Sequence, residues 1–227
     1  DAIMEVNQDK IVLDSENTAK LLFETGKYYT KSYQFTSPNY PKALEHFKHS
    51  LKIWKECYTV PHSGTATIQR EIAIVNFLQK DYKKSARGFE EVLAIYRNIY
   101  GKDTENIDIA NALREIAPSL LKDPQYYSKA INYLNQSFYI YKNILLKHFA
   151  DDEQTLTFLG LTGSITTLIQ TDGIKKKITE QASKKPVLGL ATTYNNLGEA
   201  FEANGERLKA QHYHKLALEI RKLALSP

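Results

Sequence analysis

Cysteine, tryptophan and methionine occur once each in the 227 residues, and glycine and proline are scarce, with 10 and 7 copies. The single cysteine, Cys57, excludes a disulfide framework and any zinc or iron–sulfur site built from several cysteines. So few glycines and prolines argue against a sandwich or barrel, because such folds need many tight turns. No apolar run approaches the ~20 residues of a membrane span, and no signal peptide is visible. We therefore expect an intracellular, helix-rich protein without a membrane span.

Neither sign of charge predominates, since 30 basic and 26 acidic residues leave a formal net charge of +4. That value does not demand a nucleic-acid or membrane partner. Hydrophobic residues make up 42% and charged residues 25%, which is typical of a globular protein with a sizeable core. Because the chain starts at Asp1 and its only methionine is Met4, a fragment of a longer protein is one interpretation.

The sequence does contain a recurring pattern of small and apolar residues. Near the C-terminus this pattern has two helical halves joined by Gly205, and their spacing places the residues of each half on one helix face. The members are Tyr194, Leu197, Gly198 and Phe201 in the first half, and Ala210, Ala217 and Leu218 in the second. Three earlier units follow the same template: Leu22, Gly26 and Tyr29 with Ala43, Phe47 and Ser50; Ile72, Ala73 and Phe77 with Ser85, Phe89 and Val92; Leu113, Ala117 and Leu120 with Ala130, Leu134 and Ser137. We expect small residues where two helices approach closely, and larger ones between successive pairs.

The small residues of the second halves give the repeat length. From Ala43 to Ser85 is 42 residues, from Ser85 to Ala130 is 45, and from Ala130 to Ala210 is 80. The last distance is roughly two periods, which predicts a degenerate unit at residues 153–184.

Within this degenerate unit we expect a helix, a turn at Thr171–Gly173 and a short basic helix. The apolar and small positions of the first helix are Leu156, Leu159, Gly160, Ile165, Leu168 and Ile169.

These patterns resemble the tetratricopeptide repeat, whose first helix carries Leu/Gly and an aromatic, and whose second carries Tyr-x-x-Ala, Phe and Ala. The period exceeds the usual ~34 residues, and units of this length are similar to those of the kinesin-light-chain subtype. Ile95–Asp103 matches the loop of that subtype, and Asn195–Gly198 resembles its Asn-Asn-Leu-Ala signature. The resemblance implies an all-α fold: a right-handed superhelical solenoid of about five antiparallel helix pairs, stacked because no pair buries its apolar face alone.

We expect residues 1–16 to be an N-terminal extension and residues 17–227 to form one repeat domain. The predicted repeats are 17–60, 63–102, 105–149, 152–184 and 187–225. Ser32–Asn39 should form a loop, and Pro41 should open the helix that follows it. Lys184-Lys185-Pro186 should end one segment, with the next helix starting at about Val187.

Motifs that carry chemistry are not found in the sequence. It has no glycine-rich phosphate loop and no Gly-x-Ser-x-Gly nucleophile elbow. Gly160–Ser164 is interpreted as tight helix packing, and an anion loop is the alternative. His46 and His49 share a helix face without an evident third metal ligand. We predict no catalytic residue, no metal and no cofactor, and hence a protein that is not an enzyme.

The one dense basic segment is Lys175–Lys177 together with Lys184-Lys185. It is either a solvated helix face or a contact for an acidic peptide, an anionic lipid or a nucleic acid. Because no aromatic residues alternate with these lysines, we predict no nucleic-acid partner.

The repeat resemblance places certain first-helix residues on the concave face of the solenoid, where they would line a groove. It implies that Asn195 clamps a peptide backbone, since an amide offers both a donor and an acceptor. Several cations and few acids in the groove should attract an acidic or phosphorylated linear peptide. The candidate groove residues are Lys27, Lys31, Arg70, Arg114, Asn195 and Glu199.

The predicted function is a non-enzymatic scaffold that binds a partner protein through a linear, acidic peptide. One alternative is a helical regulator whose superhelix changes when a signalling peptide binds. Another is the recruiting module of a larger multidomain enzyme or effector. The apolar end at Leu223–Leu225 predicts either further repeats or self-association through the last helix. We expect a cytoplasmic location, with a secreted effector acting in a host cytosol as the alternative.

Overall fold

The computed structural model describes residues 2–31, 37–162 and 171–225. Within these ranges all regular structure is helical, which confirms the all-α prediction. The helices are α1 (Ala2–Thr30), α2 (Tyr40–Cys57), α3 (Ser63–Leu78), α4 (Tyr82–Tyr100), α5 (Ile107–Leu120), the 3₁₀ helix η1 (Pro124–Tyr126), α6 (Tyr127–His148), α7 (Glu153–Phe158), α8 (Thr171–Thr179), α9 (Gln181–Ala203) and α10 (Arg207–Leu225).

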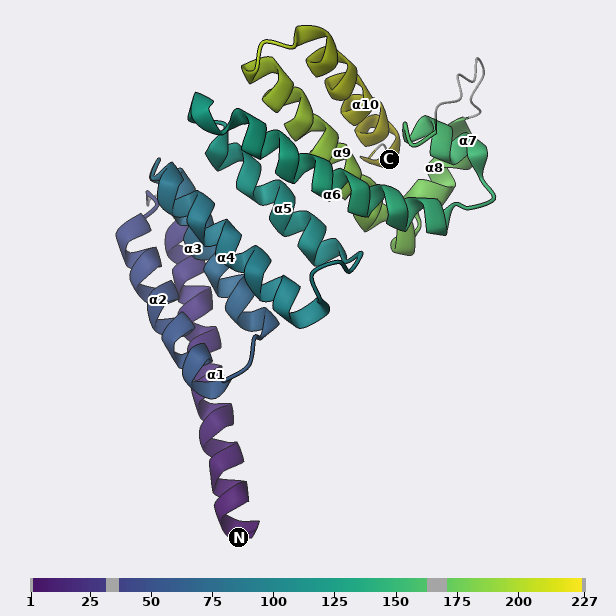
Figure 1. Ribbon diagram of the computed structural model, residues 1–227. Coiled ribbons are helices and arrows are strands. Elements are labelled where there is room, and N and C mark those ends of the chain that lie inside the picture. The colour runs from purple at the N-terminus through teal and green to yellow at the C-terminus, as the bar shows by residue number, and fades with distance from the viewer. Residues whose placement is uncertain (1, 32–36, 163–170, 226–227) are drawn as a thin grey trace. The chain divides into compact units, whose positions relative to one another are not determined.

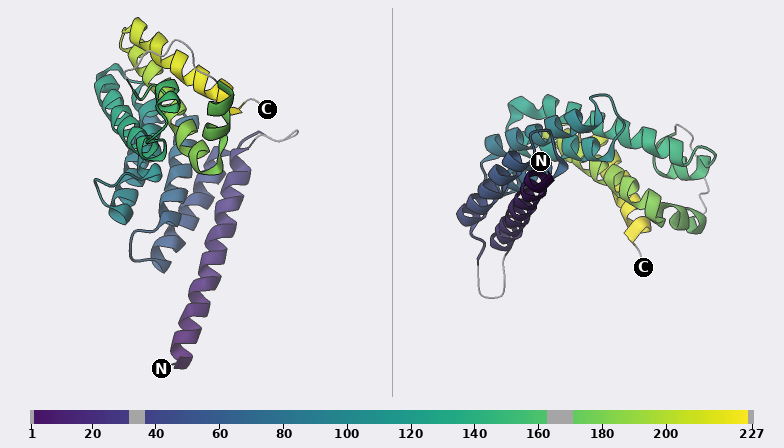
Figure 2. Two further views of the ribbon diagram at one scale, coloured as in Figure 1. Left: turned by 90° about the vertical axis from the view of Figure 1, so that its right-hand side faces the viewer. Right: turned by 90° about the horizontal axis from the view of Figure 1, so that it is seen from below.

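The chain divides into two compact units, Asp1–Asp103 and Thr104–Pro227. In the first unit α1 pairs with α2 and α3 pairs with α4, and α2 packs against α3 (Figure 1). In the second unit α5 pairs with α6 and α9 pairs with α10, while α6 packs against α9 (Figures 1 and 2). Each unit is therefore a stack of antiparallel helix pairs.

A small residue on the first helix sets how closely each pair can pack. A Cβ added to Gly26 would lie 2.6 Å from Cε1 of Phe47, so the ring of α2 occupies the space that a side chain would take. A Cβ on Gly198 would likewise lie 2.6 Å from Cε1 of His214 on α10. Phe47 and His214 each follow the small residue of their helix, Ala43 or Ala210, by four positions. The sequence pattern thus corresponds to one recurring contact.

In two of the pairs, a buried hydrogen bond also joins the first helix to the second. The Ser50 hydroxyl of α2 donates to the Ala19 carbonyl of α1 at 2.7 Å. The Ser137 hydroxyl of α6 donates to the Ala110 carbonyl of α5 at 2.8 Å. Both serines are completely buried, so these bonds satisfy polar groups within the core and fix the register of each pair.

Side-chain caps explain where several helices begin. The Asn39 side chain accepts a hydrogen bond from the Lys42 backbone at the start of α2, and Asp81 and Asn106 cap α4 and α5 in the same manner. Pro41 lies in the first turn of α2, as predicted. Residues 37–39 are outside any helix, and the remainder of the predicted loop, 32–36, lies outside the described residues.

The expected helix of the degenerate unit is wrong in its extent. The helix α7 ends at Phe158, and Gly160 follows it with a φ of 69°. Gly160 therefore lies in a turn, because a left-handed residue ends the helical path, and a Cβ added there would lie 3.2 Å from both Leu216 Cδ2 and the Tyr194 hydroxyl oxygen. Thr171–Gly173 form the first turn of α8 instead of a loop. Ile165, Leu168 and Ile169 lie outside the described residues.

The predicted helix break at Pro186 is also wrong. Helix α9 begins at Gln181, so Pro186 is its sixth residue. The Ser183 hydroxyl donates to the Lys177 carbonyl at 2.5 Å and to the Glu180 carbonyl at 3.2 Å, and so ties the first turn of α9 to α8. A proline this close to the N-terminus costs a single backbone hydrogen bond, and the burial of its ring offsets that loss.

Short α7 and α8 leave α9 in direct contact with α6. Figure 1 shows α7 and α8 beside the ends of the longer helices instead of between them. The hydroxyl of the buried Tyr194 donates to the Leu159 carbonyl at 3.0 Å and so attaches the segment after α7 to α9. None of the helices in the described ranges combines the length and the apolar character needed to cross a membrane.

The close approach of α3 and α4 makes a testable prediction. A Cβ on Gly88 would lie 2.9 Å from the Cβ of Ala73, which has no flexible end that could move away. We expect Gly88→Ala to lower the free energy of unfolding by about 1–3 kcal/mol in urea titrations. Gly173→Ala is the matched control, since its Cβ would meet nothing within 4 Å. It should leave stability unchanged or raise it by up to about 1 kcal/mol. Equal stability of the two variants would contradict the proposed close contact.

Candidate functional site

The six residues predicted for the groove divide equally between the two units. In the first unit, Lys27 Nζ lies 3.0 Å from Glu24 Oε1, and Arg70 Nη1 lies 3.4 Å from Glu71 Oε1. Lys31 is exposed just after α1. Two of these three cations therefore have an acidic neighbour on their own helix, which reduces the positive potential around them.

The amide predicted to clamp a peptide already has a partner within its own helix. Asn195 Nδ2 donates to Glu199 Oε1 at 2.8 Å, one turn further along α9. The backbone-clamp role of Asn195 stays a prediction.

Arg114, the remaining predicted residue, lies in a pocket of about 480 Å³ between α5 and α9. The residues from α9 follow one another at helical spacing and form a stripe that faces α5. The lining consists of Asn111 and Arg114 from α5 and Gln181, Lys184, Lys185, Leu188, Gly189 and Thr192 from α9.

The side chains that line this pocket carry charge of one sign, and the acidic Glu115 lies just outside the lining, with Oε1 4.0 Å from Arg114 Nη2. Arg114, Lys184 and Lys185 line it, and none of the described lining residues is acidic. Lys184 and Lys185 are exposed, whereas the Arg114 side chain is only 15% exposed. A partly buried guanidinium flanked by two mobile ammonium groups attracts anions, and it is screened less than three surface charges would be.

Neighbouring polar groups hold Arg114 in place. Arg114 Nη2 donates to Asn111 Oδ1 at 2.8 Å, and the same oxygen accepts a hydrogen bond from the Tyr141 hydroxyl at 2.8 Å. Glu115 Oε1 is more distant, at 4.0 Å from Nη2. Arg114 Nε is buried and makes no hydrogen bond within the described part of the chain. The guanidinium is thus oriented from one side and keeps donor capacity.

A glycine of α9 makes room for the tyrosine in this network. A Cβ on Gly189 would lie 2.4 Å from Cζ of Tyr141, so the ring takes the place of a side chain there. Tyr141 is completely buried, and burial raises the pKa of its hydroxyl to about 12. The tyrosine therefore stays neutral and can donate its hydrogen bond to Asn111.

The lysines at residues 175–177 do not line this pocket. Lys177 Nζ forms an ion pair with Asp152 Oδ2 at 2.6 Å, which ties α8 to the start of α7. Burial acts to raise the pKa of Asp152, but hydrogen bonds from Lys177 and Thr155 outweigh it and leave the pKa below its usual value. Part of the basic segment is therefore structural.

His46 and His214 each pack against the other helix of their pair. The imidazole of His46 stacks on the Tyr29 ring with the ring centroids 5.4 Å apart, and His214 packs against Gly198. Within the described residues, no three or more His, Cys, Asp or Glu side chains are grouped to hold a metal ion.

The sequence interpretation identified Arg114 but missed the other pocket residues as a group. Lys184 and Lys185 were assigned to a basic segment that ends at Pro186, and Leu188 to a separate helix. The spacing of 181, 184, 185, 188 and 192 follows one helix face, so a continuous helix would have revealed the stripe.

Comparison with known families shows tetratricopeptide repeats in both units. Family models described as "Tetratricopeptide repeat" match residues 38–98 and 190–227. These matches confirm the family resemblance. The helix pairs also have the long period that was taken to indicate kinesin-light-chain-like units.

Several relatives are fungal proteins named clustered mitochondria protein homolog. The Aspergillus fumigatus protein is 27% identical over 127 residues, which cover 56% of this chain and 10% of that protein. The Ajellomyces capsulatus protein is 27% identical over 113 residues, which cover 50% of this chain and 9% of that protein. The chain thus spans about a tenth of the length of these relatives.

Similar solved structures include a Podosopora anserina kinesin light chain with nearly identical TPR-like repeats. That structure is 14% identical and has a TM-score of 0.41, with 95% of this chain and 97% of that chain covered. A variant of it is 15% identical and has a TM-score of 0.47, with 94% and 98% covered.

The buried tyrosine of the pocket predicts how stability depends on alkaline pH. Because the folded-state pKa of Tyr141 is about 12 against an ordinary value of 10.0, the unfolded chain ionises this group first. Stability should therefore be intact below pH 10 and fall as the pH rises toward 12, by about 2.7 kcal/mol for two pKa units.

Tyr141→Phe should show a smaller alkaline loss in urea unfolding followed at several pH values. Tyr139→Phe is the control from the same helix, since Tyr139 is 60% exposed, and it should keep the wild-type pH dependence. An unchanged alkaline loss in Tyr141→Phe would show that this group is not the buried acid.

Proposed function

We propose that the chain, which is a tetratricopeptide-repeat protein, is an interaction scaffold that binds an acidic linear peptide in the pocket between α5 and α9. The all-positive charge of that pocket is the observation that supports this function. Three of its eight lining residues are basic, whereas 30 of the 227 residues of the chain are. A carboxylate or a phosphorylated side chain is the complementary ligand group.

Arg114 is the central anion-binding group in this proposal. Its guanidinium is planar and always charged, and the hydrogen bond to Asn111 orients it before a ligand arrives. A preoriented, partly buried cation loses less conformational entropy on binding than an exposed lysine does. Lys184 and Lys185, at the start of α9, would add attraction at longer range and speed association at low salt.

The other lining residues suit a peptide better than a free anion. The amides of Asn111 and Gln181 provide donors and acceptors, and Leu188 provides an apolar contact. A peptide offers all three complementary features, namely backbone amides, acidic groups and apolar side chains. The scaffold would then recruit its partner through a short segment, without catalysis. The single cysteine is consistent with an intracellular setting.

The relatives supply a context for this role. They are much longer proteins in which the similar stretch is a small part. We therefore favour a recruiting module of a larger assembly over a self-sufficient regulator.

Two triple variants with the same loss of charge test the site. The first is Arg114→Ala, Lys184→Ala and Lys185→Ala, and the second is Lys27→Ala, Lys31→Ala and Arg70→Ala. A fluorescently labelled aspartate-rich peptide, titrated by anisotropy, should bind the first variant less tightly by about 2–3 kcal/mol, or roughly 30- to 150-fold. The second variant should lose much less, and higher salt should weaken wild-type binding.

Other outcomes of this experiment would be informative. Wild-type affinity in the first variant would remove the pocket from the proposal. An equal loss in both variants would mean that net charge, and not this site, governs binding.

A further inference from the structure

The outer face of α10 carries exposed apolar side chains. Leu208, Leu218 and Leu225 are exposed by 84%, 52% and 59%. Leu218 and Leu225 are seven residues apart, so they lie on one side of the helix. The buried residues of α10, among them Ala217 and Ile220, lie on a different side, toward α9. A row of exposed leucines is typical of a surface that contacts another protein.

The repeat register shows what covers this face in other helix pairs. Counted from the small residue of each second helix, Leu218 corresponds to Leu51 of α2 and Phe138 of α6. Leu51 packs against a buried cluster that includes Ile68 of α3. The ring centroid of Phe138 lies 5.7 Å from that of Tyr194 in α9. In both cases the first helix of the following pair in the stack covers this position.

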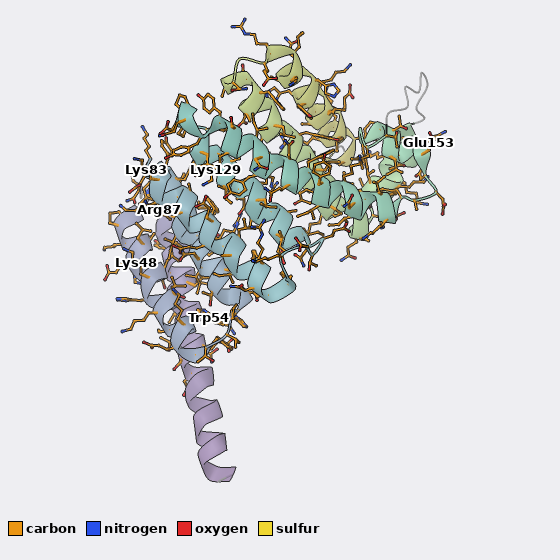
Figure 3. All side chains as sticks on the ribbon, in the orientation of Figure 1. Lys48, Trp54, Lys83, Arg87, Lys129 and Glu153 are labelled. Atoms are coloured by element: carbon orange, nitrogen blue, oxygen red, sulfur yellow. The ribbon has the colours of Figure 1, made fainter. Side chains whose placement is uncertain are left out.

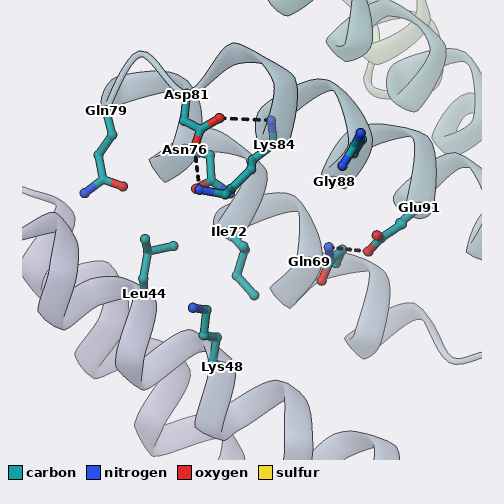
Figure 4. Close-up of a pocket in the computed structure, with 11 residues that line it drawn as sticks. Leu44, Lys48, Gln69, Ile72, Asn76, Gln79, Asp81, Lys84, Gly88 and Glu91 are labelled. Atoms are coloured by element: carbon teal, nitrogen blue, oxygen red, sulfur yellow. Dashed lines mark hydrogen bonds and ion pairs between the residues drawn. The ribbon is translucent and has the colours of Figure 1, made fainter.

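The same face of α2 can be followed at closer range in Figure 4. Leu44 and Lys48 of α2 lie beside Ile72 of α3, and Leu44 packs against the buried cluster to which Ile72 belongs. The corresponding residues of α10 are Gln211 and Lys215, and both are exposed. Helix α10 therefore has the stacking face of a second helix, but no first helix within the described residues packs on it.

Helix α1 has the complementary face, that of a first helix. Counted from the glycine that admits a ring in each first helix, Leu21 of α1 corresponds to Thr193 of α9. Thr193 is completely buried, with its hydroxyl 3.3 Å from the Ser137 hydroxyl of α6. Tyr141, four residues after Ser137, meets Gly189, four residues before Thr193, so α6 and α9 are antiparallel. Leu21, in contrast, is 69% exposed.

We propose that the outer face of α10 docks onto the outer face of α1 in a second copy of the chain, so that the helix stack continues from one copy to the next. The antiparallel contact of α6 with α9 supplies the geometry. It places Leu218 beside Leu21 and removes two exposed leucines from water. Because an α10 face meets an α1 face, the contact is head-to-tail and not a twofold dimer.

Opposite charges flank the leucine contact. Antiparallel packing puts Lys222 of α10 at the end of the contact where α1 carries Asp14. Both side chains are exposed, and neither forms an ion pair within the described residues. At the other end Lys215, whose neighbour Glu219 is 3.9 Å away, meets Glu24, which is already paired within α1. The charges therefore favour this orientation of the two helices over the reverse one.

The association should be weak. A junction between one helix and one helix pair is at the small end of protein interfaces, below ~1,200 Å². We expect a dissociation constant of about 10–100 µM. Sedimentation of the chain at concentrations from about 5 to 500 µM should therefore show a weight-average mass that rises with concentration. High salt should reduce the rise without abolishing it, because the leucine contact is apolar.

Single substitutions on the two faces test the contact. Leu21→Lys and Leu218→Lys should each stay monomeric on their own, because each would bury an unpaired charge in the junction. Both leucines are exposed, so neither substitution removes a core contact. Val60→Lys is the matched control, since Val60 is 67% exposed between α2 and α3 and belongs to neither face. It should associate as the wild-type chain does.

Mixing the two variants distinguishes a head-to-tail contact from a twofold one. Leu21→Lys keeps an intact α10 face and Leu218→Lys keeps an intact α1 face, so an equimolar mixture should form a 1:1 pair and nothing larger. A twofold contact of α10 with itself would instead let Leu21→Lys associate alone. Association of either variant alone, no association in the mixture, or a wild-type chain that stays monomeric at 500 µM would overturn the proposal.

Two further readouts show that the variants are folded and that the peptide site is separate. Trp54, the only tryptophan, lies in the core of the first unit (Figure 3), so its fluorescence reports the folding of that unit. Circular dichroism reports the helices of the second unit. Neither Leu21 nor Leu218 lines the pocket between α5 and α9, so peptide binding should persist in both variants. Self-association and peptide binding can therefore fail independently.

Discussion

The contact on which the structure depends is the insertion of a second-helix side chain into the space above a small first-helix residue. Phe47 over Gly26 and His214 over Gly198 are two copies of it at the two ends of the chain. At these distances no other residue fits without displacing a ring, so the small residue fixes both the spacing and the register of the pair. The buried Ser50 and Ser137 hydrogen bonds then fix the same register from the polar side.

Once that register is set, it determines which side chains meet between the helices. The residue three places after the small one packs against the second helix of its own pair: Tyr29 stacks on His46 of α2, and Phe201 stacks on Tyr213 of α10. In the second unit, Gly189 leaves room for the Tyr141 ring. The Tyr141 hydroxyl donates to Asn111, and Asn111 in turn accepts a hydrogen bond from Arg114 and so orients it. The arrangement around Arg114 is thus a consequence of where a small residue is placed.

Sequence periodicity was sufficient to predict the helix pairs, because small and apolar residues recur wherever two helices are in contact. It failed where local and tertiary preferences conflict. Pro186 disfavours a helix locally, yet α9 runs through it because the ring is buried, and the helix begins at Gln181, six residues before the predicted start at Val187. That error separated Lys184 and Lys185 from Leu188 and concealed the stripe that faces Arg114. An ion pair such as that between Lys27 and Glu24 also depends on side-chain rotamers. The periodicity of the sequence does not specify rotamers, so it could not predict this pair.

The net charge of this chain does not indicate where an anionic partner would bind. The total of +4 is small, and many basic side chains are neutralised by acids one turn away, as in the Lys84–Asp81 and Lys209–Glu206 pairs. Such exposed pairs contribute little to stability, but they reduce the positive potential over most of the surface. Arg114, Lys184 and Lys185, by contrast, line one pocket that has no acidic side chain among its described lining residues. An acidic segment would therefore be attracted to one defined place instead of to the surface in general, which is how a chain of nearly balanced composition can still be selective for acidic partners.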